Sequence, residues 1–188
     1  MLSHIQERGL VAFPKFTGER IYMREFRKVG GLPEDLRRWQ PTIDAMLRGI
    51  ETDGSIYLMI DQREVRAGEY HRRPGLHVDG SWDPIGGIHP APGPPGHRFL
   101  GVAPYPCEGI VLASDVTASR AFEGEFEGIP EPGNDCAHIS TAGMREVVLR
   151  AGHIYGGNVS MLHESFPVES DCKRTLVRLN IPGWEPEP

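Results

Sequence analysis

The sequence predicts a mainly β fold, an antiparallel sandwich or barrel with one or a few buttressing helices. The 23 glycines and 17 prolines are spread along the 188 residues, as is typical of many short strands joined by turns. Apolar segments of strand length are frequent, whereas only one segment has clear helical periodicity. A hydrophobic content of 39% and the lack of internal repeats indicate a single domain, residues 1–188, with a sizeable core.

The N-terminal part, residues 1–54, is expected to contribute two strands and the helix. The strands are predicted over residues 9–16 and 20–26, and the helix over residues 33–50. Pro33 suits a first helical turn, where its missing N–H is not needed. We expect the helix to pack against a sheet through apolar residues that recur at helical spacing: Leu36, Trp39, Ile43, Leu47 and Ile50.

The core is expected over residues 55–182, in a series of short strands. Strands are predicted where the apolar content is strongest, over residues 55–61, 109–114, 145–150, 159–163 and 174–181. Residues 83–107 contain seven prolines, and since proline cannot donate a backbone hydrogen bond, they cannot form a central strand. This segment is predicted to be a long loop and a candidate lid. Residues 122–133 are predicted to form a solvated connection, and residues 156–158 a turn.

Charge and cysteine content narrow the class of protein. The formal net charge is −6, so no basic surface is indicated and nucleic acid is an unfavoured partner. Cys107, Cys136 and Cys172 are odd in number and have no CxxC spacing, which favours a reducing compartment over a disulfide framework. Residues 1–9 contain no apolar signal core, and no run of 18 apolar residues exists. We expect a cytoplasmic protein with no membrane span; its oligomeric state is left open.

A histidine and a carboxylate, His77 and Asp79, stand two residues apart. On a strand, residues i and i+2 point to the same face, so both side chains can bind one metal ion. The preferred third ligand is His163, which ends an apolar strand before a turn. Two imidazoles and one carboxylate suit non-haem Fe(II). The alternative is that these side chains have only a structural role. Five further histidines lie in loops, turns or irregular segments: His71, His89, His97, His138 and His153.

Arg174 and Arg178 lie on the last predicted strand, where positions 174, 176 and 178 share one face. Two arginines on the face of an otherwise apolar strand are costly to bury unless an anion pairs with them. Arginine is also the side chain that binds a carboxylate through two parallel hydrogen bonds. The pattern indicates an anion site. The alternative is an edge strand with both arginines in water.

Taken in order, these residues resemble the Fe(II)- and 2-oxoglutarate-dependent dioxygenase superfamily. The superfamily pattern is His-x-Asp, then a distal His, then an Arg or Lys about ten residues or more later. Here it is His77-Val78-Asp79, then His163, then Arg174. The passage from Gly152 to Val168 also resembles the turn, strand and His-x-x-x-Pro-Val sequence of the family, and the resemblance covers most of the chain.

The resemblance implies a fold, a ligand set and a co-substrate. The implied fold is a double-stranded β-helix, a jelly-roll or cupin-like barrel. His77, Asp79 and His163 would hold Fe(II), and Arg174 would bind the distal carboxylate of 2-oxoglutarate, whose other carboxylate and ketone would chelate the metal. Arg178 would assist Arg174 or meet a substrate anion.

The implied activity is hydroxylation of a small-molecule substrate with O2, coupled to conversion of 2-oxoglutarate to succinate and CO2. Asp79 stands where halogenating relatives carry a small residue, which favours hydroxylation over chlorination. Trp82, Arg73 and His97 are the residues expected to contact the substrate.

Two other functions stay open at this point. One is a cupin-like metalloprotein without 2-oxoglutarate, either a direct dioxygenase or an isomerase. The other is a non-catalytic barrel that only binds a partner. The chain is also short for the superfamily, and it offers several candidates for the hydroxyl or amide group that usually contacts 2-oxoglutarate: Tyr70, Ser114 and Asn158.

Overall fold

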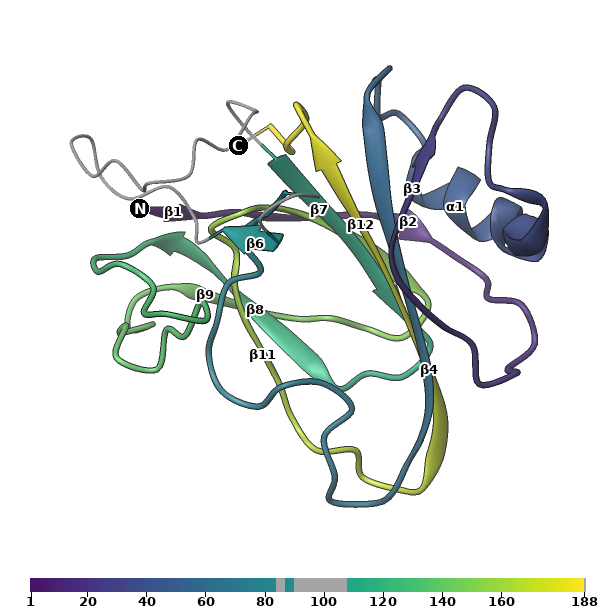
Figure 1. Cartoon of the computed structure of the whole chain (residues 1–188). Helices are drawn as coiled ribbons and strands as arrows, with labels where there is room; N and C mark the ends of the chain where they lie inside the picture. The colour runs from purple at the N-terminus through teal and green to yellow at the C-terminus, as the bar shows by residue number, and fades with distance from the viewer. Residues whose placement is uncertain (84–86, 90–107, 188) are drawn as a thin grey trace.

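The computed structural model describes residues 1–83, 87–89 and 108–187 (Figure 1). The described chain is mainly β, with two antiparallel sheets, a small hairpin and one helical segment. The mainly β prediction is therefore confirmed. Within these residues, no helix is both long enough and apolar enough to cross a membrane.

The larger sheet has six strands in the order β2-β10-β7-β12-β4-β3, each antiparallel to its neighbours. Its strands are β2 (Ile5–Leu10), β10 (His153–Asn158), β7 (Glu108–Ser114), β12 (Cys172–Pro182), β4 (Ser55–Val65) and β3 (Arg20–Arg27). The long strand β12 lies inside this sheet between β7 and β4, so it is not an edge strand. Its side chains alternate between the helix side of the sheet and the side that faces the second sheet.

The second sheet has the order β1-β8-β11, and β9 pairs with the other edge of β8. Its strands are β1 (Leu2–Ser3), β8 (Ser119–Glu125), β11 (Leu162–Ser165) and β9 (Arg145–Val148). A separate hairpin joins β5 (Ser81–Asp83) to β6 (Gly87–His89). The two sheets pack through a shared apolar cluster that includes Leu112 and Tyr155 from one sheet and Ala121 from the other. Among the described strands, the sheets are not closed into a barrel.

The helical segment covers the outer face of the larger sheet (Figure 1). It consists of a 3-10 helix, η1 (Glu34–Trp39), followed by a short α-helix, α1 (Gln40–Met46). The single helix predicted over residues 33–50 is thus wrong in form. Pro41, near the start of α1, has no N–H to donate into the preceding turn, so an α-helical bond cannot cross the junction there. The predicted apolar stripe is nevertheless buried against the sheet, as expected.

Several predicted boundaries are also wrong. The strand predicted over residues 9–16 is instead β2, Ile5–Leu10, and residues 11–16 are irregular. Residues 122–125, predicted as a connection, belong to β8, and residues 156–158, predicted as a turn, belong to β10. The turn instead occupies residues 159–161, so that strand β11 begins at Leu162.

The glycines of β10 explain the misplaced turn. A Cβ on Gly157 would lie 2.4 Å from the Met161 sulfur, and one on Gly156 would lie 2.8 Å from the Arg8 side chain. These residues are glycine because neighbouring groups approach the strand closely on both faces. Their composition therefore resembles that of a turn although they lie in a strand.

Candidate metal centre

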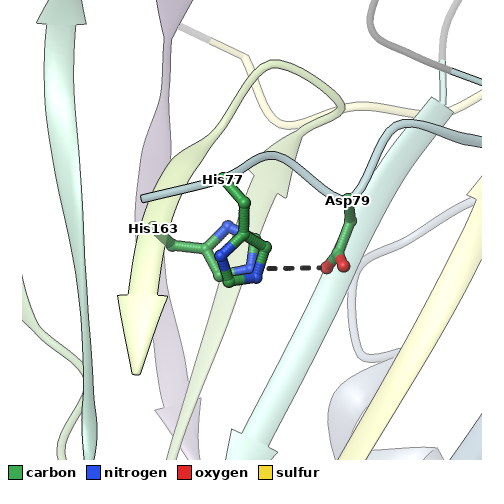
Figure 2. A group of neighbouring side chains, drawn as sticks. All are labelled: His77, Asp79 and His163. Atoms are coloured by element: carbon green, nitrogen blue, oxygen red, sulfur yellow. Dashed lines mark ion pairs between the residues drawn. The ribbon is translucent and has the colours of Figure 1, made fainter. Parts of the chain in front are cut away.

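His77, Asp79 and His163 meet between the two sheets, and their ligand atoms all lie within 4.8 Å of one another (Figure 2). His163 lies on β11, whereas His77 and Asp79 lie on a short extended segment beside it. The backbone N–H groups of His77 and His163 each donate to the other residue's carbonyl, at 2.9 Å in both directions. The segment is therefore docked on β11 like an additional strand, and the two-residue spacing turns His77 and Asp79 toward His163.

The two imidazoles are held in one tautomer. The Nδ1 atom of His77 lies 2.7 Å from the Gly75 carbonyl oxygen, and the Nδ1 atom of His163 lies 3.0 Å from that of Met161. A carbonyl oxygen can only accept, so each Nδ1 carries the hydrogen and donates it. The Nε2 lone pairs are left to bind a metal, as in other metal-binding histidines whose second nitrogen is anchored.

Burial keeps His77 in the form that binds metals. Only 7% of the residue is exposed. This burial, reinforced by the nearby His163, lowers the pKa of His77 to about 3. The imidazole is therefore neutral at physiological pH, which a metal ligand requires.

Asp79 is ionised and oriented by an arginine. Its Oδ1 accepts a hydrogen bond from Arg178 Nη1 at 2.5 Å, and its Oδ2 lies 3.7 Å from His163 Nε2. Burial alone would raise the pKa of this carboxyl, but Arg178 and the two imidazoles hold it well below its usual range. One carboxylate oxygen is thus engaged by the guanidinium and the other faces the histidines.

A cavity of about 190 Å³ lies at this cluster and is lined by residues from both sheets. Its walls include the three candidate ligands and apolar side chains such as Met59, Leu112 and Leu176. Arg72, Arg73 and Arg178 also line it. The cavity thus combines a metal-binding group, apolar walls and positive charge.

Arg174 is buried beyond this cavity, with 1% of its surface exposed. Its Nε donates to the hydroxyl of Ser114 at 3.0 Å and its Nη2 to that of Ser119 at 3.3 Å. Its Nη1 has no hydrogen-bond partner, and among the described residues no carboxylate lies within ion-pair distance of the guanidinium. Burial lowers the pKa of Arg174 to about 10. Since Ser119 also lines the cavity, the arginine stands close behind its wall.

A second buried carboxylate, Asp61 on β4, lies in the same interior. It pairs with Arg63 at 2.8 Å, Arg72 at 3.2 Å and Arg20 at 3.5 Å. His71 Nε2 lies 3.4 Å from it, an ion-pair distance without hydrogen-bond geometry. Burial alone would raise the pKa of Asp61, but His71 and Arg63 hold it well below its usual range.

The residues predicted to contact the substrate have different outcomes. Arg73 lines the cavity, and its guanidinium donates to the carbonyls of Gly133 at 2.5 Å and Asn134 at 3.3 Å. Trp82 lies in β5, where the structure does not describe side chains, and His97 lies outside the described residues.

The two arginines of β12 are both buried between the sheets, so the alternative of a solvated edge strand is wrong. Of the candidate partners for 2-oxoglutarate, Ser114 contacts Arg174, whereas Tyr70 is exposed and Asn158 bonds to the N-terminal strand. Ser119 and Asn134 are site residues that the sequence analysis missed.

The fold and the site together define a mainly β protein with a His-Asp-His group in an interior cavity. Comparison of the chain with known protein families, curated proteins and solved structures finds no match.

Proposed function

We propose that the protein is a non-haem Fe(II)- and 2-oxoglutarate-dependent oxygenase that hydroxylates a small molecule. The observation that carries the proposal is the pairing of two features in one interior. His77, Asp79 and His163 present metal-binding atoms together. Arg174 is buried nearby, and one of its guanidinium nitrogens has no partner among the described residues.

The donor set fits iron. Two neutral imidazoles and one carboxylate, bound on one side of the ion, leave positions for a co-substrate and for oxygen, which suits Fe(II). The anchored Nδ1 atoms of His77 and His163 support this, since metal-binding histidines usually have such an anchor. The ionised Asp79 would offset part of the charge of the metal.

The surroundings of Arg174 fit a carboxylate. A buried guanidinium without a counter-ion is costly, and an anionic ligand with oxygen acceptors would remove that cost. Arg174 Nη1 would bind the distal carboxylate of 2-oxoglutarate, and the Ser119 hydroxyl would add a second donor once its hydrogen turns away from the Ala118 carbonyl. This need for an anion favours the oxygenase over a cupin-like protein without 2-oxoglutarate.

The protein residues would bind, orient and shield the reactants. Bound iron and 2-oxoglutarate would supply the oxidation, in which O2 yields one hydroxyl group on the substrate while the keto acid becomes succinate and CO2. Met59, Leu112 and Leu176 would exclude water from the metal side of the cavity. Arg178 would hold Asp79 in its ligand orientation, a role that replaces the predicted contact with 2-oxoglutarate.

The two facing antiparallel sheets support the double-stranded β-helix as the fold behind this function. In that fold the metal ligands and the arginine come from strands that face the interior of the barrel. The arrangement of His163 on β11 and Arg174 on β12 is consistent with it.

The test is an anaerobic titration of the metal-free protein with Fe(II) and 2-oxoglutarate. We expect a weak visible charge-transfer band that appears only when both are present. Metal binding without the band would contradict the 2-oxoglutarate part of the proposal and favour a metalloprotein of another kind.

The first variant to measure is Arg174→Ala. We expect it to raise the 2-oxoglutarate concentration that gives half-maximal absorbance of the charge-transfer band by about 100-fold. Removing one partner of a buried charge pair costs about 3 kcal/mol. Iron affinity, measured by titration alone, should stay unchanged. Arg63→Ala is the control, because Arg63 stands opposite Arg174 on β4 but pairs with Asp61. An equal loss of iron and 2-oxoglutarate in Arg174→Ala would mean that the assignment is wrong.

A further inference from the structure

Two non-glycine residues in the described chain have a positive φ angle, Met23 at 50° and Asn134 at 63°. This conformation is uncommon for residues with a side chain, and it persists where the surrounding structure enforces it. Asn134 contacts the metal-ligand candidate Asp79, and Met23 contacts Arg178, which in turn contacts Asp79. The two strained positions therefore call for an explanation at this site.

Asn134 holds the backbone of the ligand segment. Its side-chain Nδ2 donates to the Asp79 carbonyl at 3.0 Å, and its own carbonyl accepts from the Val78 N–H at 3.2 Å. The same carbonyl accepts from Arg73 Nη2 at 3.3 Å. The left-handed backbone lets one residue turn its amide and its carbonyl toward neighbouring points of the segment. Asn134 is 8% exposed and lines the cavity.

Met23 contacts Arg178, the residue whose guanidinium holds the Asp79 carboxylate. It lies at an irregularity of β3, where the register with β4 shifts between Ile21 and Arg24. Such a bulge redirects a side chain, and here Met23 is buried with its sulfur 3.7 Å from Arg178 Nη2. Arg178 in turn holds Asp79 Oδ1.

We infer that Asn134 is a positioning residue for metal binding, acting on the Asp79 backbone while Arg178, backed by Met23, acts on the carboxylate. With its backbone carbonyl and one oxygen both fixed, Asp79 presents its other oxygen to the site occupied by the histidines. This inference rests on the proposed metal-binding function. It assigns a role to a residue that belongs to neither the ligand set nor the arginine pair.

The test is Co(II) binding to the metal-free protein, followed by visible absorption and by calorimetry. In Asn134→Gly the left-handed backbone is retained without strain, and only the amide is lost. We expect its Co(II) affinity to fall by about 10-fold, the lower end of what loss of an outer-shell partner costs. The Tm of the metal-free variant should stay close to that of the parent, because the relief of strain offsets the lost hydrogen bond.

A second variant and a control separate positioning from folding. Asn134→Asp keeps the shape but places an acceptor against the Asp79 carbonyl, so its affinity should fall at least as far. Thr42→Ala is the control, since Thr42 Oγ1 also donates to a backbone carbonyl, that of Ala12, on the helical side of the larger sheet and away from the site. It should lower the Tm and leave Co(II) affinity and the Co(II) spectrum unchanged.

The outcomes are distinguishable. If the parent protein binds Co(II) and both Asn134 variants bind it equally well, the positioning role is overturned and the metal site stands. If Thr42→Ala weakens binding as much as Asn134→Gly, the effect is general and the positioning role is again overturned. If the parent protein binds no Co(II), the proposed function falls together with this inference.

Discussion

At the scale of single residues, the interior between the sheets is unusual in the number of charges that it buries. Asp61, Asp79, Arg174 and Arg178 are each less than a fifth exposed, and three of them have an ion-pair partner. Buried charges are tolerated when paired and are expensive when left alone. Arg174 is the exception, because no described residue supplies an ion-pair partner for its guanidinium.

Asp61 provides a prediction on stability and pH. Asp61→Asn should lower the free energy of unfolding at pH 7 by about 2 kcal/mol, because it removes a buried carboxylate and leaves several cations beside it. The pKa of Asp61 is depressed in the folded protein, so its stabilisation is complete above the ordinary carboxyl pKa and is lost as the pH falls toward the depressed value. In urea unfolding, the difference in unfolding free energy between parent and variant should therefore become smaller below about pH 4.

The control for this prediction lies on the same strand. Glu64 pairs with Lys173 at 3.6 Å, and both side chains are largely exposed. Glu64→Gln should change the unfolding free energy little, at pH 7 or in acid. If the loss of unfolding free energy in Asp61→Asn stays constant down to pH 2, the ionised Asp61 carboxylate does not stabilise the fold as assigned.

At the scale of elements, the site depends on the turn that joins β10 to β11. Met161 closes this turn by donating its N–H to the Asn158 carbonyl at 3.0 Å, and its own carbonyl anchors His163 Nδ1. Gly157 leaves the space that the Met161 side chain fills. Met161 thus connects strand β10 and the turn after it to the candidate ligand His163.

Gly157→Ala tests this connection. The added Cβ would meet the Met161 sulfur at 2.4 Å and the His4 carbonyl at 3.1 Å, so neighbouring groups must shift. We expect the free energy of unfolding to fall by about 1–3 kcal/mol, as overpacking usually costs, measured by urea denaturation. Gly54→Ala is the control, since the nearest atom to its added Cβ is at an ordinary contact distance of 3.6 Å. Equal stabilities for the two variants would show that Met161 has room to move.

At the scale of the whole molecule, the candidate ligands join parts of the chain that are distant in sequence. His77 and Asp79 lie before the hairpin β5–β6. His163 lies on β11, about forty residues after β8, the central strand of the second sheet. A metal bound to all three would tie these parts together only in the folded state.

Metal ions should therefore stabilise the fold as a whole. At a free Co(II) concentration of about 100 times the Kd, linkage gives about 2.7 kcal/mol, which for a chain of this size raises the Tm by roughly 5–10 °C. Calorimetry should show this rise, and a chelator should reverse it. His163→Ala should remove the response. An unchanged Tm at saturating Co(II) would argue against these residues as ligands.

The extent to which sequence predicted the molecule differs between its parts. Patterns that repeat within one strand are informative. Alternation predicts that Arg174 and Arg178 share one face of their strand, and the structure shows that this face is buried. The two-residue spacing likewise predicts that His77 and Asp79 point to one side. These are consequences of strand geometry, which local sequence determines.

Features set by distant contacts were missed. The local sequence at Gly156 and Gly157 predicts a turn, because nothing local shows that Arg8 and Met161 pack against them. Asn134 lies in an acidic segment rich in glycine and proline, and its role depends on a backbone carbonyl on another segment. Ser119 likewise belongs to the site only because it accepts a hydrogen bond from Arg174, which lies on a strand distant in sequence.

The reciprocal hydrogen bonds between His77 and His163 have a kinetic consequence. Pairing these residues closes a long loop, and long-range β pairings of this kind form slowly, after local turns and hairpins. The ligand group therefore cannot assemble in a partly folded chain in which β11 is still unpaired. The visible absorption of bound Co(II) would then report the last stage of refolding. It should appear later than the β-sheet signal in circular dichroism.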